Sequence, residues 1–107
     1  MPNTPQAQIL QLNELINYQD GAVVSRIITK GEKGNVTLFA FDAAQELSEH
    51  TAPFEALLQI LDGAAEVKIS GQAFNLKTGE AIILPANQPH AVKATQKFKM
   101  LLTMIRA

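Results

Sequence analysis

The side chains of this 107-residue sequence best suited to acid–base chemistry near neutral pH, or to metal binding, are two histidines and ten carboxylates. The sequence contains no cysteine, which excludes a disulfide framework, a thiolate zinc site and a thiol nucleophile. Any such chemistry therefore has to be built on His50, on His90 and on carboxylates close to them.

Each histidine stands in a segment of unusual composition. Residues 49–55 place His50 between two glutamates, just before an apolar run. Residues 85–90 contain two prolines and an asparagine ahead of His90, which predicts a rigid turn because proline presets φ and asparagine tolerates left-handed backbone. A histidine held in this way suits a ligand or a general base. The structural alternative is that each ring only hydrogen-bonds the backbone where a loop meets a strand.

Short apolar stretches with turn signals between them dominate the rest of the chain and predict an all-β sandwich or barrel. Short connections favour antiparallel neighbours. We expect a polar loop over residues 42–55, a turn at Asp62-Gly63, and one short helical turn or an irregular segment within residues 9–18. The expected strands are residues 22–29, 35–41, 56–61, 66–70, 73–76, 81–84, 89–92 and 98–105.

Length and charge limit the organisation and the partners. The length predicts one domain, which we divide into an N-terminal arm (residues 1–20) and a barrel (residues 21–107). Nine Lys and Arg against ten Asp and Glu leave no positive excess for nucleic acid or anionic lipid. No apolar run reaches the ~20 residues that span a bilayer, and the first residues lack the pattern of a secretory signal. We therefore expect a cytoplasmic protein.

The spacing before the second histidine matches a known motif. Gly79 is followed after five residues by Pro85, after one more by Asn87, and after two more by His90. This order resembles the second motif of the cupins, with Asn87 where that family usually has glycine.

The first cupin motif is also in register. Counting back from Gly63, Ala56 stands where the family usually has a metal-binding Glu or Gln, and Ala52 where it has its second histidine. His50 stands at the first histidine and Ala44 at the opening glycine. Over residues 22–105 the chain therefore resembles a small single-domain cupin, within a bacterial subfamily.

The resemblance implies a jelly-roll barrel, commonly a homodimer, with the motif residues facing the interior. Family members that bind iron, manganese, nickel or zinc use three histidines and one Glu or Gln. Here only His50 and His90 occupy those positions, and alanine cannot act as a ligand. A divalent metal would then be held by an incomplete site, which disfavours oxygenase chemistry because its facial triad needs two histidines and a carboxylate.

The neighbouring carboxylates do not replace the missing ligands in this interpretation. Glu49 and Glu55 each adjoin a motif position, and strand alternation points neighbours to opposite faces. We expect a small-molecule pocket around the histidine pair, lined by Ala52, Ala56, Leu58, Arg26 and Met100. For Arg26 the alternatives are the outer face of the sheet or a dimer interface.

Three function classes follow. The first is an isomerase or lyase acting on a small polar metabolite, such as a sugar acid, with His50 and His90 as acid and base or as metal ligands. The second is a module that binds or senses a small molecule without turnover. The third is a dimer in which the histidines have only structural roles. Fold alone does not choose among them, because cupins host many activities.

Overall fold

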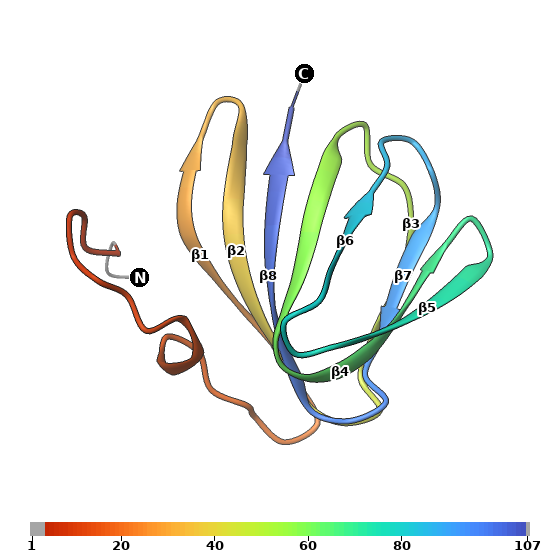
Figure 1. Ribbon diagram of the computed structural model, residues 1–107, viewed down its shortest axis with the longest axis horizontal. Coiled ribbons are helices and arrows are strands. Elements are labelled where there is room, and N and C mark those ends of the chain that lie inside the picture. Colours follow the sequence, from red (N-terminus) through yellow and green to blue (C-terminus); the bar gives the residue numbers. More distant parts are fainter. Residues whose placement is uncertain (1–3, 107) are drawn as a thin grey trace.

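A single antiparallel sheet curls into a barrel in the structure, a computed structural model that describes residues 4–106 (Figure 1). A 3₁₀ turn, Leu12–Glu14, precedes the sheet. The strands are β1 (Val23–Gly31), β2 (Gly34–Phe41), β3 (Glu46–His50), β4 (Glu55–Ile69), β5 (Gln72–Lys77), β6 (Ala81–Leu84), β7 (His90–Lys93) and β8 (Phe98–Ile105). The all-β prediction is therefore confirmed. In the described residues no helix is long and apolar enough to cross a membrane.

The long strand β4 joins the two halves of the barrel. Its first half pairs with β8 and β6, and its second half pairs with β5 and β7. Beyond these, β2 and β1 extend one half and β3 extends the other. At one edge β1 pairs with its sequence neighbour β2, whereas at the other edge β3 pairs with the distant strand β7, a long-range pairing of the kind found in a jelly roll.

The predicted turn at Asp62-Gly63 is wrong, because β4 runs through it without a break. The register with β8 shifts between Ile60 and Asp62, which is a β-bulge. The bulge changes which residues face inward: even-numbered positions such as Ile60 are buried before it and odd-numbered ones such as Val67 after it. A turn signal in the sequence thus marks a bend within one strand.

The predicted loop over residues 42–55 is also partly wrong, because it contains β3. This five-residue strand is polar and largely exposed, so it lacks the apolar alternation by which a strand is recognised in sequence. Backbone pairing with β7 forms it. The predicted strands over residues 81–84 and 98–105 coincide with β6 and β8.

The hydrophobic core fills the barrel interior from both halves. Phe41 and Phe98 are fully buried and stack with their ring centroids 4.4 Å apart. A second, smaller cluster lies on the outer face of β2, where Leu38 and Ala40 pack against Ile16 of the N-terminal segment. Residues 12–18 therefore cover part of the sheet.

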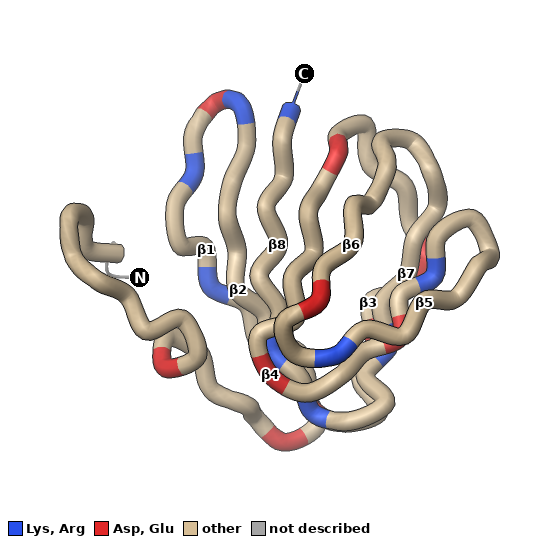
Figure 2. Tube along the Cα trace, in the orientation of Figure 1, with Lys and Arg blue, Asp and Glu red and all other residues tan. Residues whose placement is uncertain are grey.

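The two ends of the barrel are formed by different loops and turns. The histidine end holds residues 50–55 and 84–90 and is the upper end in Figure 1. The opposite end holds residues 42–45, 62–63 and 94–97, where Tyr18 reaches the sheet. Acidic and basic positions are interspersed at turns and strand ends around the barrel (Figure 2).

Candidate functional site

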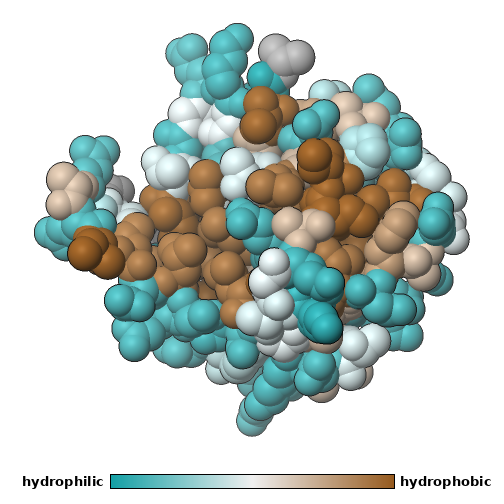
Figure 3. All heavy atoms as spheres, viewed as in Figure 1, coloured by the Kyte–Doolittle hydropathy of each residue, from teal (hydrophilic) through white to brown (hydrophobic). Residues whose placement is uncertain are grey.

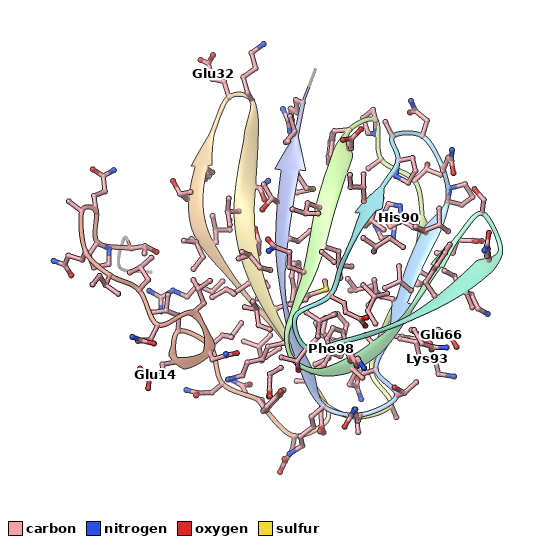
Figure 4. All side chains as sticks on the ribbon, in the orientation of Figure 1. Glu14, Glu32, Glu66, His90, Lys93 and Phe98 are labelled. Carbon is pink, nitrogen blue, oxygen red and sulfur yellow. The ribbon has the colours of Figure 1, made fainter. Side chains whose placement is uncertain are left out.

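His50 and His90 face each other at the histidine end. His50 is the last residue of β3 and His90 the first of β7, and the two are paired across the ladder. Their ring centroids lie 4.3 Å apart at an interplanar angle of 66°. Figure 4 shows the His90 side chain directed toward the barrel interior, near β6. The sequence prediction that both histidines face one place is consistent with this geometry.

A bulge in β3 makes this pairing possible. Leu47 pairs with Val92 and His50 pairs with His90, so two residues of β3, Ser48 and Glu49, lie opposite one residue of β7. In an unbroken ladder, Glu49 would stand opposite His90. The extra residue instead turns His50 to the face shared with His90, and it is the step that assembles the pair.

Backbone carbonyls fix the orientation of both rings. The His50 Nδ1 atom lies 2.8 Å from the Ser48 oxygen, and the His90 Nδ1 atom lies 3.2 Å from the Gln88 oxygen. A carbonyl oxygen only accepts hydrogen bonds, so Nδ1 carries the hydrogen in each ring. In the neutral form each Nε2 atom then presents a lone pair. The site thus offers two acceptors of the same kind at one place.

The two rings differ in environment. His90 is 8% exposed, whereas His50 is exposed. Burial is the main cause that lowers the pKa of His90; the charge of nearby His50 lowers it further, and the hydrogen bond to Gln88 opposes both. His90 therefore favours the neutral state at neutral pH, while His50 is the member of the pair that solvent reaches.

The loops that carry the histidines are held to each other. The Asn87 amide donates a hydrogen bond to the Ala52 oxygen at 2.8 Å, and the Ser70 amide donates one to the Pro89 oxygen at 2.8 Å. Asn87 has φ of 65°, in the left-handed region that asparagine tolerates. The turn predicted over residues 85–90 is thus braced on both sides.

Comparison with known proteins decides the family. The cupin domain family matches residues 37–106, which include both histidines. This chain is a cupin. Because the match spans most of the barrel, the resemblance seen in the two motifs is confirmed.

Solved structures agree with this assignment. The fold is similar to a conserved protein of unknown function from Streptococcus pyogenes, with a TM-score of 0.93, 30% identity, and coverage of 99% of this chain and 93% of that one. It is also similar to a cupin superfamily protein from Desulfitobacterium hafniense (TM-score 0.91, 27% identity, coverage 99% and 97%). A cupin 2 conserved barrel domain protein from Leptotrichia buccalis is 38% identical with a TM-score of 0.88, over 91% of this chain and 47% of that one.

The apolar residues predicted to line a pocket are placed in the core of this cupin. Ala56, Leu58 and Met100 belong to the main core cluster and are 6%, 0% and 1% exposed. They face inward, as predicted, but they are packed against one another rather than against solvent. Ala52 lies in the loop after His50, where its carbonyl braces Asn87. The accessible part of the site is therefore the His50 side.

Arg26 is placed on the outer face of the sheet, in agreement with the alternative given for it. It pairs with Leu38, whose side chain packs under the N-terminal segment. One guanidinium nitrogen donates to the Leu15 oxygen at 3.1 Å. Its partner is thus the chain's own backbone, and the structure does not bring it to the histidines.

The donors of the site do not fit a four-ligand metal centre. Glu49 faces an outer groove together with Glu66 and Lys68. Glu55 is paired with Ile105 on the outward face of β4. Within residues 4–106, no group of three or more His, Cys, Asp or Glu side chains is arranged to hold a metal ion. Two imidazoles alone fall short of the ligand number that protein metal sites use.

Sequence reasoning missed the two carbonyls that orient the rings. Ser48 and Gln88 contribute backbone oxygens, which every residue type has, so composition carries no signal for them. The bulge at Ser48 and Glu49 was missed for a related reason, since both its residues are polar and exposed. The bulge becomes visible only when the pairing of β3 with β7 is known, because two residues then separate Leu47 from His50 where one separates Val92 from His90.

Proposed function

We propose that this cupin binds a small polar metabolite at the histidine end, and that the Nε2 atoms of His50 and His90 recognise it. The observation that carries the proposal is the opposed pair of rings, 4.3 Å apart, with both Nδ1 atoms held by backbone carbonyls. A purely structural histidine needs one such bond, and here the second nitrogen of each ring is left for another partner.

The chemistry of the pair limits the ligand. Two Nε2 atoms that act as acceptors favour a molecule that presents hydrogen-bond donors, such as hydroxyl groups. Sugars and related metabolites carry adjacent hydroxyls of this kind. Entry from the His50 side fits the exposure of that ring.

Histidine side-chain ¹⁵N NMR tests this proposal directly, because it distinguishes a protonated ring nitrogen from one with a free lone pair. We expect Nδ1 to be protonated in both rings, and we expect added polyols or sugar acids to shift the two Nε2 signals together. His50→Ala, at the exposed ring, should abolish the response, whereas Glu49→Gln should leave it unchanged. Unchanged Nε2 signals across a broad metabolite panel would contradict the proposal.

Proton transfer is the second candidate, favoured by the unequal environments of the rings. His90, whose pKa is lowered by burial, suits a general base, and His50 lies beside it as the second ring, on the side that solvent reaches. This is the arrangement of an isomerase or lyase. Solvent deuterium incorporated into a bound hydroxy acid, and lost in His90→Asn, would separate turnover from binding.

Divalent metal binding is a weaker candidate, since the site provides two donors. Nickel, zinc, iron or manganese bound there would need water to complete the shell. We expect dialysed, tag-free protein to hold less than about a tenth of an equivalent.

A homodimer is also expected from the family. In support, Ile27 on β1 and Ile83 on β6 are 49% and 54% exposed. Hydrophobic surface also gathers over β1 and β2 and over β8, β4 and β6 (Figure 3). Exposed apolar patches commonly mark interfaces. Sedimentation should report a dimer that Ile83→Ser weakens, and a monomer at all concentrations would exclude it.

A further inference from the structure

A second cavity lies at the histidine end, separate from the two rings. It has a volume of about 270 Å³ and is formed by the loop after β3, the start of β4, the turn after β6 and the end of β8. Its lining residues are Pro53, Phe54, Glu55, Ala86 and Ile105. We call it the Phe54 pocket.

The walls of the Phe54 pocket are apolar except for one negative charge. Ile105 is 57% exposed and pairs with Glu55, so both side chains leave the same face of the sheet. Phe54 is half-buried, so part of its ring remains accessible to solvent. The pocket thus combines an aromatic ring, exposed aliphatic surface and a carboxylate that solvent reaches.

The chain itself places a cation on this aromatic ring. The guanidinium of Arg106 lies over Phe54, 5.5 Å from the ring centroid. The Arg106 amide donates a hydrogen bond to the Lys33 oxygen at 2.7 Å, which anchors this end of the backbone. Figure 2 shows the acidic start of β4 and the basic end of β8 at the same end of the barrel. The ring face is therefore a position that a positive charge already occupies.

We propose that the Phe54 pocket is a binding site for a small organic cation, a quaternary or primary ammonium group on a short carbon chain. The ammonium group takes the place of the Arg106 guanidinium over Phe54 and is attracted by the Glu55 carboxylate. Ring faces attract cations through their quadrupole, and recognition of quaternary ammonium by aromatic residues is a known use of this interaction.

Size and charge exclude other classes of ligand. A cavity of about 270 Å³ lies just below the usual range of ligand sites, so a compact group fits and a large cofactor does not. An anion would be repelled by Glu55 but attracted by Arg106, so Arg106→Gln, which should strengthen the binding of a cation, would weaken that of an anion. A neutral apolar group would fill the walls but would gain nothing from Glu55 or from the ring quadrupole.

Arg106 competes with the ligand in this proposal, because its guanidinium already lies over the Phe54 ring. Removing a residue that merely helps to form a pocket weakens binding. Removing a residue that occupies the position of the ligand strengthens binding instead. Arg106→Gln should therefore raise the affinity, while Phe54→Leu, which keeps the apolar volume and loses the ring, should lower it.

The experiment compares two probes of the same shape, choline and its uncharged isostere 3,3-dimethyl-1-butanol, by amide chemical-shift titration at constant ionic strength. We expect choline to shift the signals of residues 54, 55 and 105 and to bind roughly 3- to 30-fold more tightly than the isostere. Glu55→Gln should weaken choline binding about fivefold, and Arg106→Gln should strengthen it about threefold. Glu49→Gln, which removes a carboxylate from the outer groove, is the matched control and should change nothing.

Three results would overturn the proposal: equal affinity for the two probes, weaker choline binding in Arg106→Gln, or no shift at Phe54 and Glu55 at millimolar choline. The amide spectrum of each variant reports its fold in the same measurement. Shifts confined to the histidine rings would place the cation in the other site and would also contradict it.

Discussion

The two ends of the barrel differ in what their polar groups contact. At the opposite end, the Tyr18 hydroxyl donates to Asp62 at 2.5 Å, and the Gly21 amide donates to Asp42 at 2.7 Å. Each of these groups is bound within the chain, and the fully buried stack of Phe41 on Phe98 lies behind them.

At the histidine end, by contrast, polar side chains retain atoms that could bind another molecule. The rings of His50 and His90 bind backbone carbonyls through Nδ1, which leaves the Nε2 atom of each ring available to a ligand. Beside them, Ile105 is exposed and Glu55 faces a cavity. The difference indicates that the polar groups of the opposite end stabilise the barrel, whereas the histidine end is where we propose that a ligand binds. Mutations at the two ends should separate stability from binding.

Restoring metal ligands at the histidine end should give the largest effect. Ala52→His combined with Ala56→Glu completes the four positions of the cupin motif. Structural zinc sites bind with roughly 10–16 kcal/mol over four ligands, so two added ligands should raise zinc affinity by at least ~100-fold. Titration calorimetry measures this, and the gain should disappear when His50→Ala is added. No gain in a folded variant would mean that these alanines do not face the pair.

Two truncations on the same strand compare the ends directly. Phe98→Ala, at the opposite end of β8, should lower the free energy of unfolding by about 3–5 kcal/mol, because it empties the stack with Phe41. Ile105→Ala, at the histidine end of β8, should cost less than about 1 kcal/mol because Ile105 is 57% exposed. Urea unfolding measures both. Equal costs would remove the stability contrast between the ends.

The pH dependence of stability tests the buried ring. Burial and neighbouring His50 lower the pKa of His90 in the folded state, so the unfolded chain binds this proton more readily. The free energy of unfolding should therefore fall as the pH drops through about 6.5 toward the folded pKa of His90. In His90→Asn this fall should be smaller. A steeper fall of the free energy of unfolding in that variant would show that groups other than His90 bind the proton that destabilises the fold.

Much of the fold could be predicted from the sequence, because strands such as β6 and β8 have apolar runs bounded by turn residues. The pairing of His50 with His90 was accessible through the motif spacing. β3 and its bulge could not be predicted, because their residues are mostly polar and only the partner strand β7 defines their register.

The pocket residues show a second limit of sequence reasoning. The inward direction of Ala56 and Met100 follows from alternation, but whether they line a space or pack together depends on the opposite wall of the barrel. For Arg26, alternation left two faces open, and the N-terminal segment that covers one of them has too weak a pattern to be placed in advance. Phe54 and Arg106 meet only because the start of β4 pairs with the end of β8, where Glu55 lies opposite Ile105.

Tyr18→Phe tests how the N-terminal segment contributes to the opposite end. Burial and the hydrogen bond and charge of Asp62 raise the pKa of the Tyr18 hydroxyl, so the folded state retains this proton. The variant should lose about 1 kcal/mol at neutral pH. Wild-type stability should also fall above about pH 10, where the unfolded tyrosine ionises, and less so in the variant. Chemical unfolding at neutral and alkaline pH measures both effects. An unchanged neutral stability would show that the hydrogen bond from Tyr18 to Asp62 contributes nothing to holding residues 12–18.

The smallest expected effect concerns two left-handed residues, one at each end. Ala44 has φ of 70°, and its amide donates to the Ala94 oxygen at 2.9 Å; Asn87 has φ of 65° at the histidine end. Left-handed backbone costs alanine about 1–2 kcal/mol, and glycine returns roughly 0.5–1 kcal/mol of this through its more flexible unfolded chain. Ala44→Gly should therefore stabilise the protein by up to about 1 kcal/mol. Asn87→Gly should gain close to nothing, because asparagine already tolerates this geometry. Thermal unfolding of the two variants measures the difference, and a larger gain at Asn87 would place the strained turn at the histidine end.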